Sequence, residues 1–316
     1  MTATTPFRLR ASELKPLAVR SNGPAARHAL GHFGAIALAG VAVWHSLGTV
    51  WAAPLTILLG YMLAFLFNAE HEAAHQTAFH TRLYNNLLGH AAGLVIVLPY
   101  GYYRVFHWDH HRYTQDPDRD PELAMPLPES RLGLFWYMTG LPNWRDRLRM
   151  LFVHGVAGRV TARWVPAEQR RSIVVEARCY LAVYAVVIAA SIATRSLAAL
   201  WLWIVPVMIG QLFLRPYLLA EHTGCARSSN MLENTRTTYT NAFVRFFAWN
   251  MPYHVEHHAY PAVPFHALPK LNALLGEHIT HNGRGYRAST ASALSHLRAR
   301  GQSVVAPPPD PPSSPS

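Results

Sequence analysis

Apolar residues gather into four long runs along this chain, and the runs form two pairs with short turns between their members. The runs cover residues 30–47 and 50–68 in the first pair and 174–194 and 197–214 in the second. Each run is close to the length of about 20 residues with which an apolar helix crosses the hydrocarbon core of a bilayer. The pattern therefore predicts two transmembrane hairpins with four spans.

The composition agrees with a membrane protein. Hydrophobic residues make up 51% of the chain and charged residues only 14%, whereas roughly a quarter of the residues in a typical soluble domain are charged. Indole rings favour the headgroup level of a bilayer, and four of them occur near the ends of the runs, at Trp44, Trp51, Trp201 and Trp203. We therefore expect an all-α integral membrane fold.

More than half of the chain lies outside the four runs. Segments 69–173 and 215–306 are long enough to form a helical cap, so that residues 1–306 make a single membrane domain. The last residues, 307–316, read PPPDPPSSPS. Such a segment has no apolar surface to bury and is predicted to be disordered.

The distribution of positive charge predicts the side on which the cap lies. Lys and Arg together number five in residues 1–28, twelve in 69–175 and eight in 220–316, whereas the turns within the two pairs hold only Arg195. Loops rich in Lys and Arg stay in the cytoplasm. We therefore expect both termini and the cap to be cytoplasmic, in a multi-pass protein of the inner (cytoplasmic) membrane.

Nine of the 19 histidines fall into four groups on the cap side of the spans. One group is an HxxxH string, two are HxxHH strings and the fourth is a single histidine; in chain order they are His71 and His75; His107, His110 and His111; His222; and His254, His257 and His258. Residues three or four apart share one face of a helix, so each string directs its imidazoles the same way. Imidazole suits iron, zinc, copper and nickel, and nine donors are about right for two ions.

The three strings resemble the boxes of the membrane-bound di-iron fatty-acid desaturases and hydroxylases, which carry HxxxH, HxxHH and HxxHH in this order. The likeness runs from about Asn68 to Lys270, and flanking strings such as FHWDHHRYTQDP (106–117) and NMPYHVEHH (250–258) look like bacterial members. The short chain and the segment EHTG (221–224) are most similar to the branch that includes dihydrorhizobitoxine desaturase.

This resemblance implies a fold, a reaction and a cofactor. The family has two transmembrane hairpins and a cytosolic cap, and it uses two iron ions (Fe2+/Fe3+) with O2 as co-substrate. The expected reaction places a carbon–carbon double bond in an aliphatic substrate, foremost a fatty acyl lipid. The boxes would supply the metal ligands and His222 would complete the set, with no catalytic residue separate from the ligands.

A histidine that binds a metal through one ring nitrogen needs an acceptor for the other. Carboxylates beside the ligand positions are candidates for this role, namely Glu72, Asp109, Glu221 and Glu256. Asn250, one helical turn before His254, could reach the site directly or through water. The string from Asp116 to Asp120 imitates the start of a calcium loop, but its sixth position is Pro121 and its twelfth is Leu127, so no such loop is predicted.

Several other functions are compatible with part of the pattern. Inside the family, hydroxylation is the alternative reaction, and a small amino-acid-like metabolite is the alternative substrate. A membrane zinc metalloprotease could use His71 and His75 with Glu72 as general base, but seven patterned histidines would then be unused. A haem protein needs paired histidines within the spans, where only His32 and His45 occur. A non-catalytic metal or lipid carrier does not explain nine ligands.

The sequence also bears on partners. It has no HPGG haem motif and only Cys179 and Cys225, too few to ligate an iron–sulfur cluster. We therefore expect a separate electron donor, ferredoxin-like, with its reductase. The net charge of +11 favours an acidic donor and anionic membrane lipid, and no motif indicates nucleic-acid binding.

Overall fold

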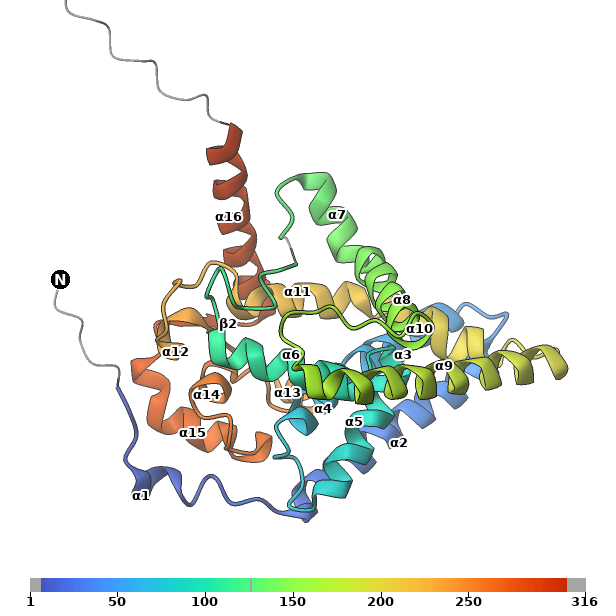
Figure 1. Cartoon of the computed structure of the whole chain (residues 1–316), viewed down its shortest axis with the longest axis horizontal. Coiled ribbons are helices and arrows are strands. Elements are labelled where there is room, and N and C mark those ends of the chain that lie inside the picture. The colour runs from blue at the N-terminus through green and yellow to red at the C-terminus, as the bar shows by residue number, and fades with distance from the viewer. Residues whose placement is uncertain (1–6, 126, 306–316) are drawn as a thin grey trace, which may run out of the picture.

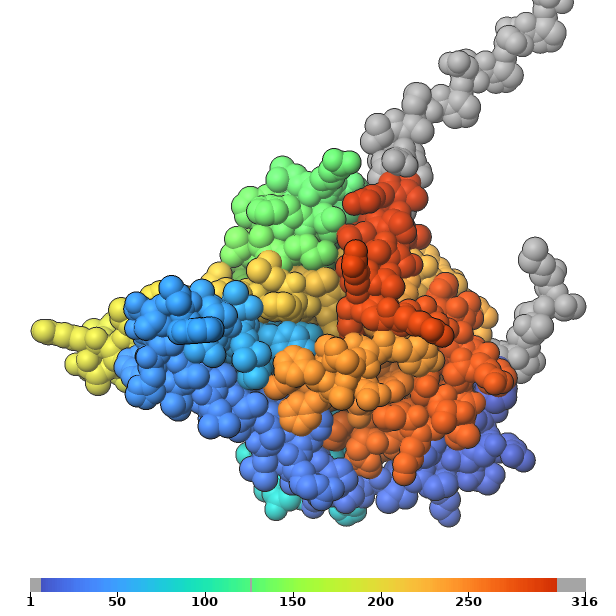
Figure 2. Space-filling view, turned by 180° about the vertical axis from the view of Figure 1, so that it is seen from behind, coloured from blue at the N-terminus to red at the C-terminus, as the bar shows by residue number. Residues whose placement is uncertain are grey.

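The computed structural model describes residues 7–125 and 127–305, so the prediction of disorder for 307–316 lies outside the described residues. The chain is mostly helical, as expected, with α9 and α2 running together toward the right of Figure 1 and the short helices α12, α14 and α15 gathered on the left. Seen from behind, the helical arm narrows to the turn between the third and fourth spans, drawn yellow in Figure 2, whereas the cap is broad.

Within residues 7–125 and 127–305, four helical segments are long and apolar enough to cross a membrane, which confirms the predicted number of spans. They consist of α2 (Asn22–Ser46); α3 (Ala52–Ala64) with α4 (Leu66–Ala74); η1 (Ala167–Gln169) with α9 (Arg170–Ala193); and η2 (Leu200–Ile204), α10 (Val205–Ile209) and α11 (Gln211–His222). The second and fourth segments continue past the apolar runs, which stop at 68 and 214. Their last turns are polar yet buried, because the cap covers them.

A close contact between α3 and α10, with the turn that leads into α11, sets the height of the second span relative to the fourth. A Cβ atom on Gly60 would overlap the backbone of Pro206, and one on Gly210 would overlap the backbone of Gly60. Small residues at a helix crossing let two backbones approach closely. Because these helices lead directly into the segments that hold His71 and His222, the contact also positions those two histidines relative to each other.

The cap is built from two stretches of chain. The first holds α5 (Arg82–Ile96), α6 (Tyr100–Tyr113), α7 (Arg131–Thr139) and α8 (Leu141–Gly155). The second holds α12 (Met231–Asn234), β1 (Arg236–Tyr239), α13 (Ala242–Phe247), α14 (His254–Ala259), η3 (Phe265–Ala267), α15 (Leu268–Leu275), η4 (Gly276–His278), β2 (His281–Arg284) and α16 (Tyr286–Val305). Near the N-terminus, α1 spans Ala11–Leu14. The two strands pair in parallel from Arg236↔His281 to Tyr239↔Arg284, an element that the helical cap prediction did not include.

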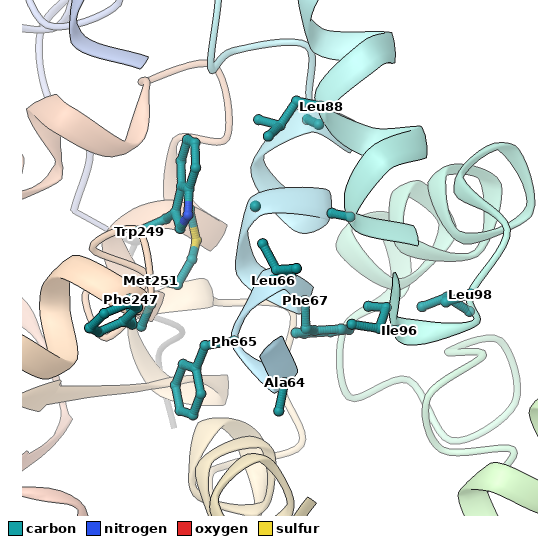
Figure 3. Packing of buried hydrophobic residues seen from close by; sticks show 14 of the residues in the cluster. Ala64, Phe65, Leu66, Phe67, Leu88, Ile96, Leu98, Phe247, Trp249 and Met251 are labelled. Carbon is teal, nitrogen blue, oxygen red and sulfur yellow. The ribbon is translucent and has the colours of Figure 1, made fainter. Parts of the chain in front are cut away.

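The core lies where α4 enters the cap. Figure 3 shows Leu66 of α4 between Trp249 and Met251 of the C-terminal stretch on one side and Ile96 of α5 on the other. All four side chains are almost fully buried. The Trp249 indole N–H donates to His32 Nδ1 at 3.2 Å, and His32 Nε2 lies 2.9 Å from the Met62 carbonyl oxygen. This chain of contacts joins α2 and the second span to the C-terminal part of the cap.

Candidate metal centre

All nine histidines of the four groups converge inside the cap, next to this core. His71 is in α4 and His75 caps its C-terminal end; the second string lies in α6, His222 ends α11, and the third string lies in α14. The eight imidazoles of the strings are almost fully buried, and the His222 side chain is mostly buried, with 12% of it exposed. Because the spacings of three and four residues are helical in all three strings, each helix presents its rings on one face, as the sequence predicted.

Five of these imidazoles form a first group, His71, His75, His107, His111 and His257, whose ligand nitrogens all lie within 4.8 Å of one another. The Nε2 atoms of His71 and His257 are 2.8 Å apart, and those of His75 and His107 are 2.7 Å apart. Burial, together with the neighbouring imidazoles, holds the pKa values of His75 and His107 well below the ordinary histidine value. The first group is therefore a set of neutral nitrogen donors.

The other four histidines form a second group around His222. The nitrogens of His110, His222 and His258 lie within 4.8 Å of one another. His254 Nε2 is 3.1 Å from His222 Nε2, which in turn is 3.2 Å from His110 Nε2. The structure thus places five of the nine histidines in one group and three in another, with His254 beside His222 of the second, and each group could hold a metal ion.

The hydrogen bonds of the outer ring nitrogens show why the second group fits a cation. His110 Nδ1 donates to Asp120 Oδ1 at 2.9 Å, and His222 Nδ1 donates to the Asn234 carbonyl oxygen at 3.3 Å. When both rings are neutral, each turns an unprotonated Nε2 toward the other. The two lone pairs, 3.2 Å apart, then repel each other unless a proton or a metal ion lies between them. The donor set of the second group accordingly fits a bound metal ion.

Two acidic residues at this group were not among the sequence candidates. Asp120 accepts from His110 and also from the backbone N–H groups of Gln115 (2.8 Å) and Glu122 (2.9 Å). Glu122 Oε2 lies 3.2 Å from His110 Nε2 and 4.0 Å from His222 Nε2. Although burial lowers the pKa of His110, these two carboxylates outweigh it and raise that pKa above its ordinary value. The sequence did contain a signal for these two acidic ligand partners. It is the acidic string that directly follows the second box, which does not form a calcium loop.

Of the predicted acceptors, Glu221 lies beside a histidine, with Oε1 3.5 Å from His254 Nδ1. Glu72 instead accepts from the backbone N–H of Phe265 at 3.1 Å, and Asp109 faces Arg112 at 3.6 Å. A residue directly next to a ligand in a helix points about 100° away from it. For this reason Glu72 and Asp109 do not face the imidazoles that adjoin them in the sequence.

The remaining two candidates brace the helix that carries the third box. Glu256 accepts from Thr237 Oγ1 at 2.5 Å and from the side-chain amide of Asn272. Asn250 donates to the Phe265 carbonyl oxygen at 3.1 Å. These bonds tie α14 and the loop before it to β1, α15 and η3. Both side chains therefore hold the third box in position through its surroundings.

A cavity of about 240 Å³ adjoins both histidine groups. His71 and His107 of the first group and His110, His222 and His254 of the second line it. The rest of its wall is largely apolar and includes Phe67, Leu98, Tyr103, Phe106, Met150 and Leu218. An apolar chain in this cavity could therefore lie in contact with both groups.

Comparison with known proteins agrees with this geometry. The family model described as fatty acid desaturase matches residues 23–290. The sn-1 oleoyl-lipid 12-desaturase of Picosynechococcus sp. is 35% identical over 96 residues, which cover 30% of this chain and 26% of that protein. Dihydrorhizobitoxine desaturase of Bradyrhizobium elkanii is 28% identical over 238 residues, covering 70% of this chain and 66% of that protein.

A plant relative aligns over a longer stretch. The endoplasmic-reticulum acyl-lipid omega-3 desaturase (cytochrome b5) of Arabidopsis thaliana is 24% identical over 282 residues, which cover 82% of this chain and 70% of that protein. The matches to the two bacterial relatives span less than two thirds of those proteins. The family model, in contrast, includes all four spans almost completely and all nine clustered histidines. The chain belongs to the fatty acid desaturase family.

Proposed function

We propose that this protein is an O2-dependent di-iron desaturase that introduces a carbon–carbon double bond into an aliphatic substrate, foremost a fatty acyl chain. The observation that carries this proposal is the pair of buried imidazole groups opening onto one apolar cavity. Two bound irons would supply the oxidising power, drawn from O2, that an unactivated C–H bond demands. The protein would contribute the binding, the orientation of the chain and the exclusion of water.

The two groups would hold one iron each. The first group offers five imidazoles. The second offers the imidazoles of His110, His222 and His258 and that of His254 beside His222, together with the Glu122 carboxylate, which lies 3.2 Å from His110 Nε2. We assign Glu122 as the fifth donor of the second group on this geometry. Asp120 and the Asn234 carbonyl oxygen would hold the rings of His110 and His222 with their Nε2 atoms directed inward.

Removing two hydrogens from the substrate and reducing O2 to two waters requires two further electrons, which a separate donor must supply. We propose that they enter at Trp108. Its ring centroid lies 4.9 Å from that of His75, its N–H donates to the Ala74 carbonyl oxygen at 3.1 Å, and it is 40% exposed. The cleft onto which it opens is also lined by Arg104 and Arg112, so the surface suits an acidic, ferredoxin-like donor.

This entry point can be tested by following iron reduction in a stopped-flow spectrophotometer. Trp108→Leu should slow reduction by reduced ferredoxin while leaving reduction by dithionite almost unchanged, because the small reductant does not need the docking surface. Arg104→Glu combined with Arg112→Glu should weaken ferredoxin binding, and the exposed Arg149→Glu serves as the matched control. Equal slowing with both reductants would show that Trp108 supports the metal site instead of conducting electrons.

We also propose that the protein lies in the inner membrane with its cap in the cytoplasm, and that residues 1–306 act as one membrane domain. The asymmetry of Lys and Arg supports this orientation. In addition, His75 directly follows the second span and His222 ends the fourth. These two histidines therefore lie at the cap end of the spans. In the proposed orientation this end faces the cytoplasm, where a soluble electron donor would reach them.

The reaction itself is tested by mass spectrometry of lipids and metabolites from cells that express either the intact protein or His257→Ala. Desaturation gives a product lighter by two hydrogens, which is the expected result. A product heavier by one oxygen atom from O2 would mean hydroxylation. If only a polar metabolite changes and every acyl chain stays the same, the acyl substrate is wrong and the amino-acid-like substrate is favoured.

A further inference from the structure

Two arginine side chains line the cavity beside the histidines. Arg147 of α8 is 8% exposed and Arg215 of α11 is 7% exposed. Arg147 Nη1 donates to the Ile96 carbonyl oxygen at 2.6 Å, and Arg215 Nε donates to Gln211 Oε1 at 3.0 Å. A guanidinium group has five N–H donors, so each side chain retains donors beyond these bonds.

The carboxylates that share this cavity are engaged with other groups. Glu122 lies against His110 and Glu221 beside His254, while Asp146 pairs with Arg145 at 2.8 Å. Within the described residues, no carboxylate oxygen lies within 4 Å of either buried guanidinium. Glu122 still attracts Arg215 electrostatically, and Tyr137 lies beside the same guanidinium, but neither arginine forms a salt bridge with the described residues of the cavity.

Such a pair of cations is costly to bury without an anion. Burial, and next repulsion from Arg215, lower the pKa of Arg147 to about 10. The fully buried Glu70 attracts Arg147 electrostatically but does not line the cavity. At neutral pH both guanidinium groups are charged, and both residues line the cavity.

The size of this space limits the ligand. The cavity of about 240 Å³ is smaller than the 300–1,000 Å³ that is typical for drug-sized ligands. Arg215 and His222 lie seven residues apart on α11, which corresponds to about 10 Å along a helix. The extended chain of a medium-length aliphatic acid has a comparable length, and the wall between the two residues includes the apolar Leu218.

We propose that the substrate carries its own carboxylate or phosphate, that Arg147 and Arg215 bind this anion, and that the aliphatic part extends along the apolar wall to the histidines. The role of the histidine end rests on the function proposed above, whereas the anion site requires only the two guanidinium groups. The assignment narrows the substrate class from any aliphatic chain to an anionic one, such as a free aliphatic acid.

Binding can be measured without turnover by isothermal titration calorimetry on the purified full-length holoprotein in detergent. The probes are octanoate, octyl phosphate and the neutral octanamide. We expect at least one of the two anions to bind about 10- to 100-fold more tightly than octanamide, since hydrogen bonds to charged groups are the strong ones. Arg147→Met and Arg215→Met should each remove most of this preference, Arg215→Lys should retain part of it, and the exposed Arg145→Met should leave it unchanged.

Equal binding of octanamide and both anions to the unmodified protein would overturn the proposal even if the Met variants did not fold. So would an unchanged preference in folded Met variants. A preference for octyl phosphate over octanoate would support the site and identify its ligand as a phosphate. If the anions bind as expected but cells form no desaturated product, the proposed reaction fails and the anion site stands. If desaturated lipids appear without any anion preference, the reaction stands and the anion site fails.

Discussion

We expect Asp120→Asn to separate the two proposed metal positions. The side chain of Asp120 is 2% exposed and accepts three hydrogen bonds, from His110 Nδ1, Gln115 N and Glu122 N, at 2.8–2.9 Å. The substitution keeps the shape but replaces one acceptor oxygen with an amide NH2 group. Either the His110 ring or the Gln115 backbone N–H then faces a donor, so the ring loses its fixed orientation or the loop loses its anchor.

The magnitude follows from these bonds. A hydrogen bond to a charged group contributes about 1.5–3 kcal/mol, and loss of an outer partner of a ligating histidine typically costs about 10- to 100-fold in metal affinity. The two estimates describe the same range of free energy. Because His110 belongs to the second group alone, the loss should concern one ion and leave the ion at the first group in place.

The assay is iron content per chain after dialysis against a graded series of chelator concentrations. The unmodified protein should retain about two irons per chain, as the two groups imply. Asp120→Asn should release one of them at a chelator concentration about 10- to 100-fold lower than the unmodified protein does. Asp118→Asn, at an exposed position in the same loop, is the control and should behave like the unmodified protein. Iron retention in Asp120→Asn equal to that of the control would refute the reasoning, and so would parallel loss of both ions.

Three further predictions concern the ligands, the spans and the orientation. His257→Ala should abolish turnover while the protein stays in the membrane fraction, because the ligand lies in the cap; activity that survives in this variant would exclude the di-iron assignment. Gly60→Ala should lower the free energy of unfolding in detergent by roughly 1–3 kcal/mol, because its Cβ overlaps the Pro206 backbone. The control Gly40→Ala, with open space around it, should leave the melting temperature unchanged. Equal melting temperatures of the two variants would show that the spans shift without cost. A topology reporter near Glu129 should read cytoplasmic and one at Ser196 periplasmic; the reverse pattern, or the same side for both, would contradict the proposed orientation.

The sequence was sufficient to predict features that depend on a short, regular pattern of residues along the chain. Four apolar runs predicted four spans, and helical spacing within the boxes predicted that each string presents its rings together; the structure agrees on both points. The ends of the spans were harder to predict. The residues around His71 and His222 are polar, and only the cap that buries them explains why the helices continue there.

The sequence alone therefore determined the membrane class, the number of spans and the set of histidines, because hydrophobicity and helical periodicity are local properties of the chain. Only the tertiary structure decided which histidines share a group, that Asp120 orients His110, and that Glu72 and Asp109 face away from the imidazoles next to them in the sequence. It also placed Arg147 and Arg215, 68 residues apart in sequence numbering, in the wall of one cavity. Contacts of this kind depend on how distant helices cross and rotate, and the close approach of Gly60 and Gly210 that sets one such crossing leaves no periodic signal in the chain.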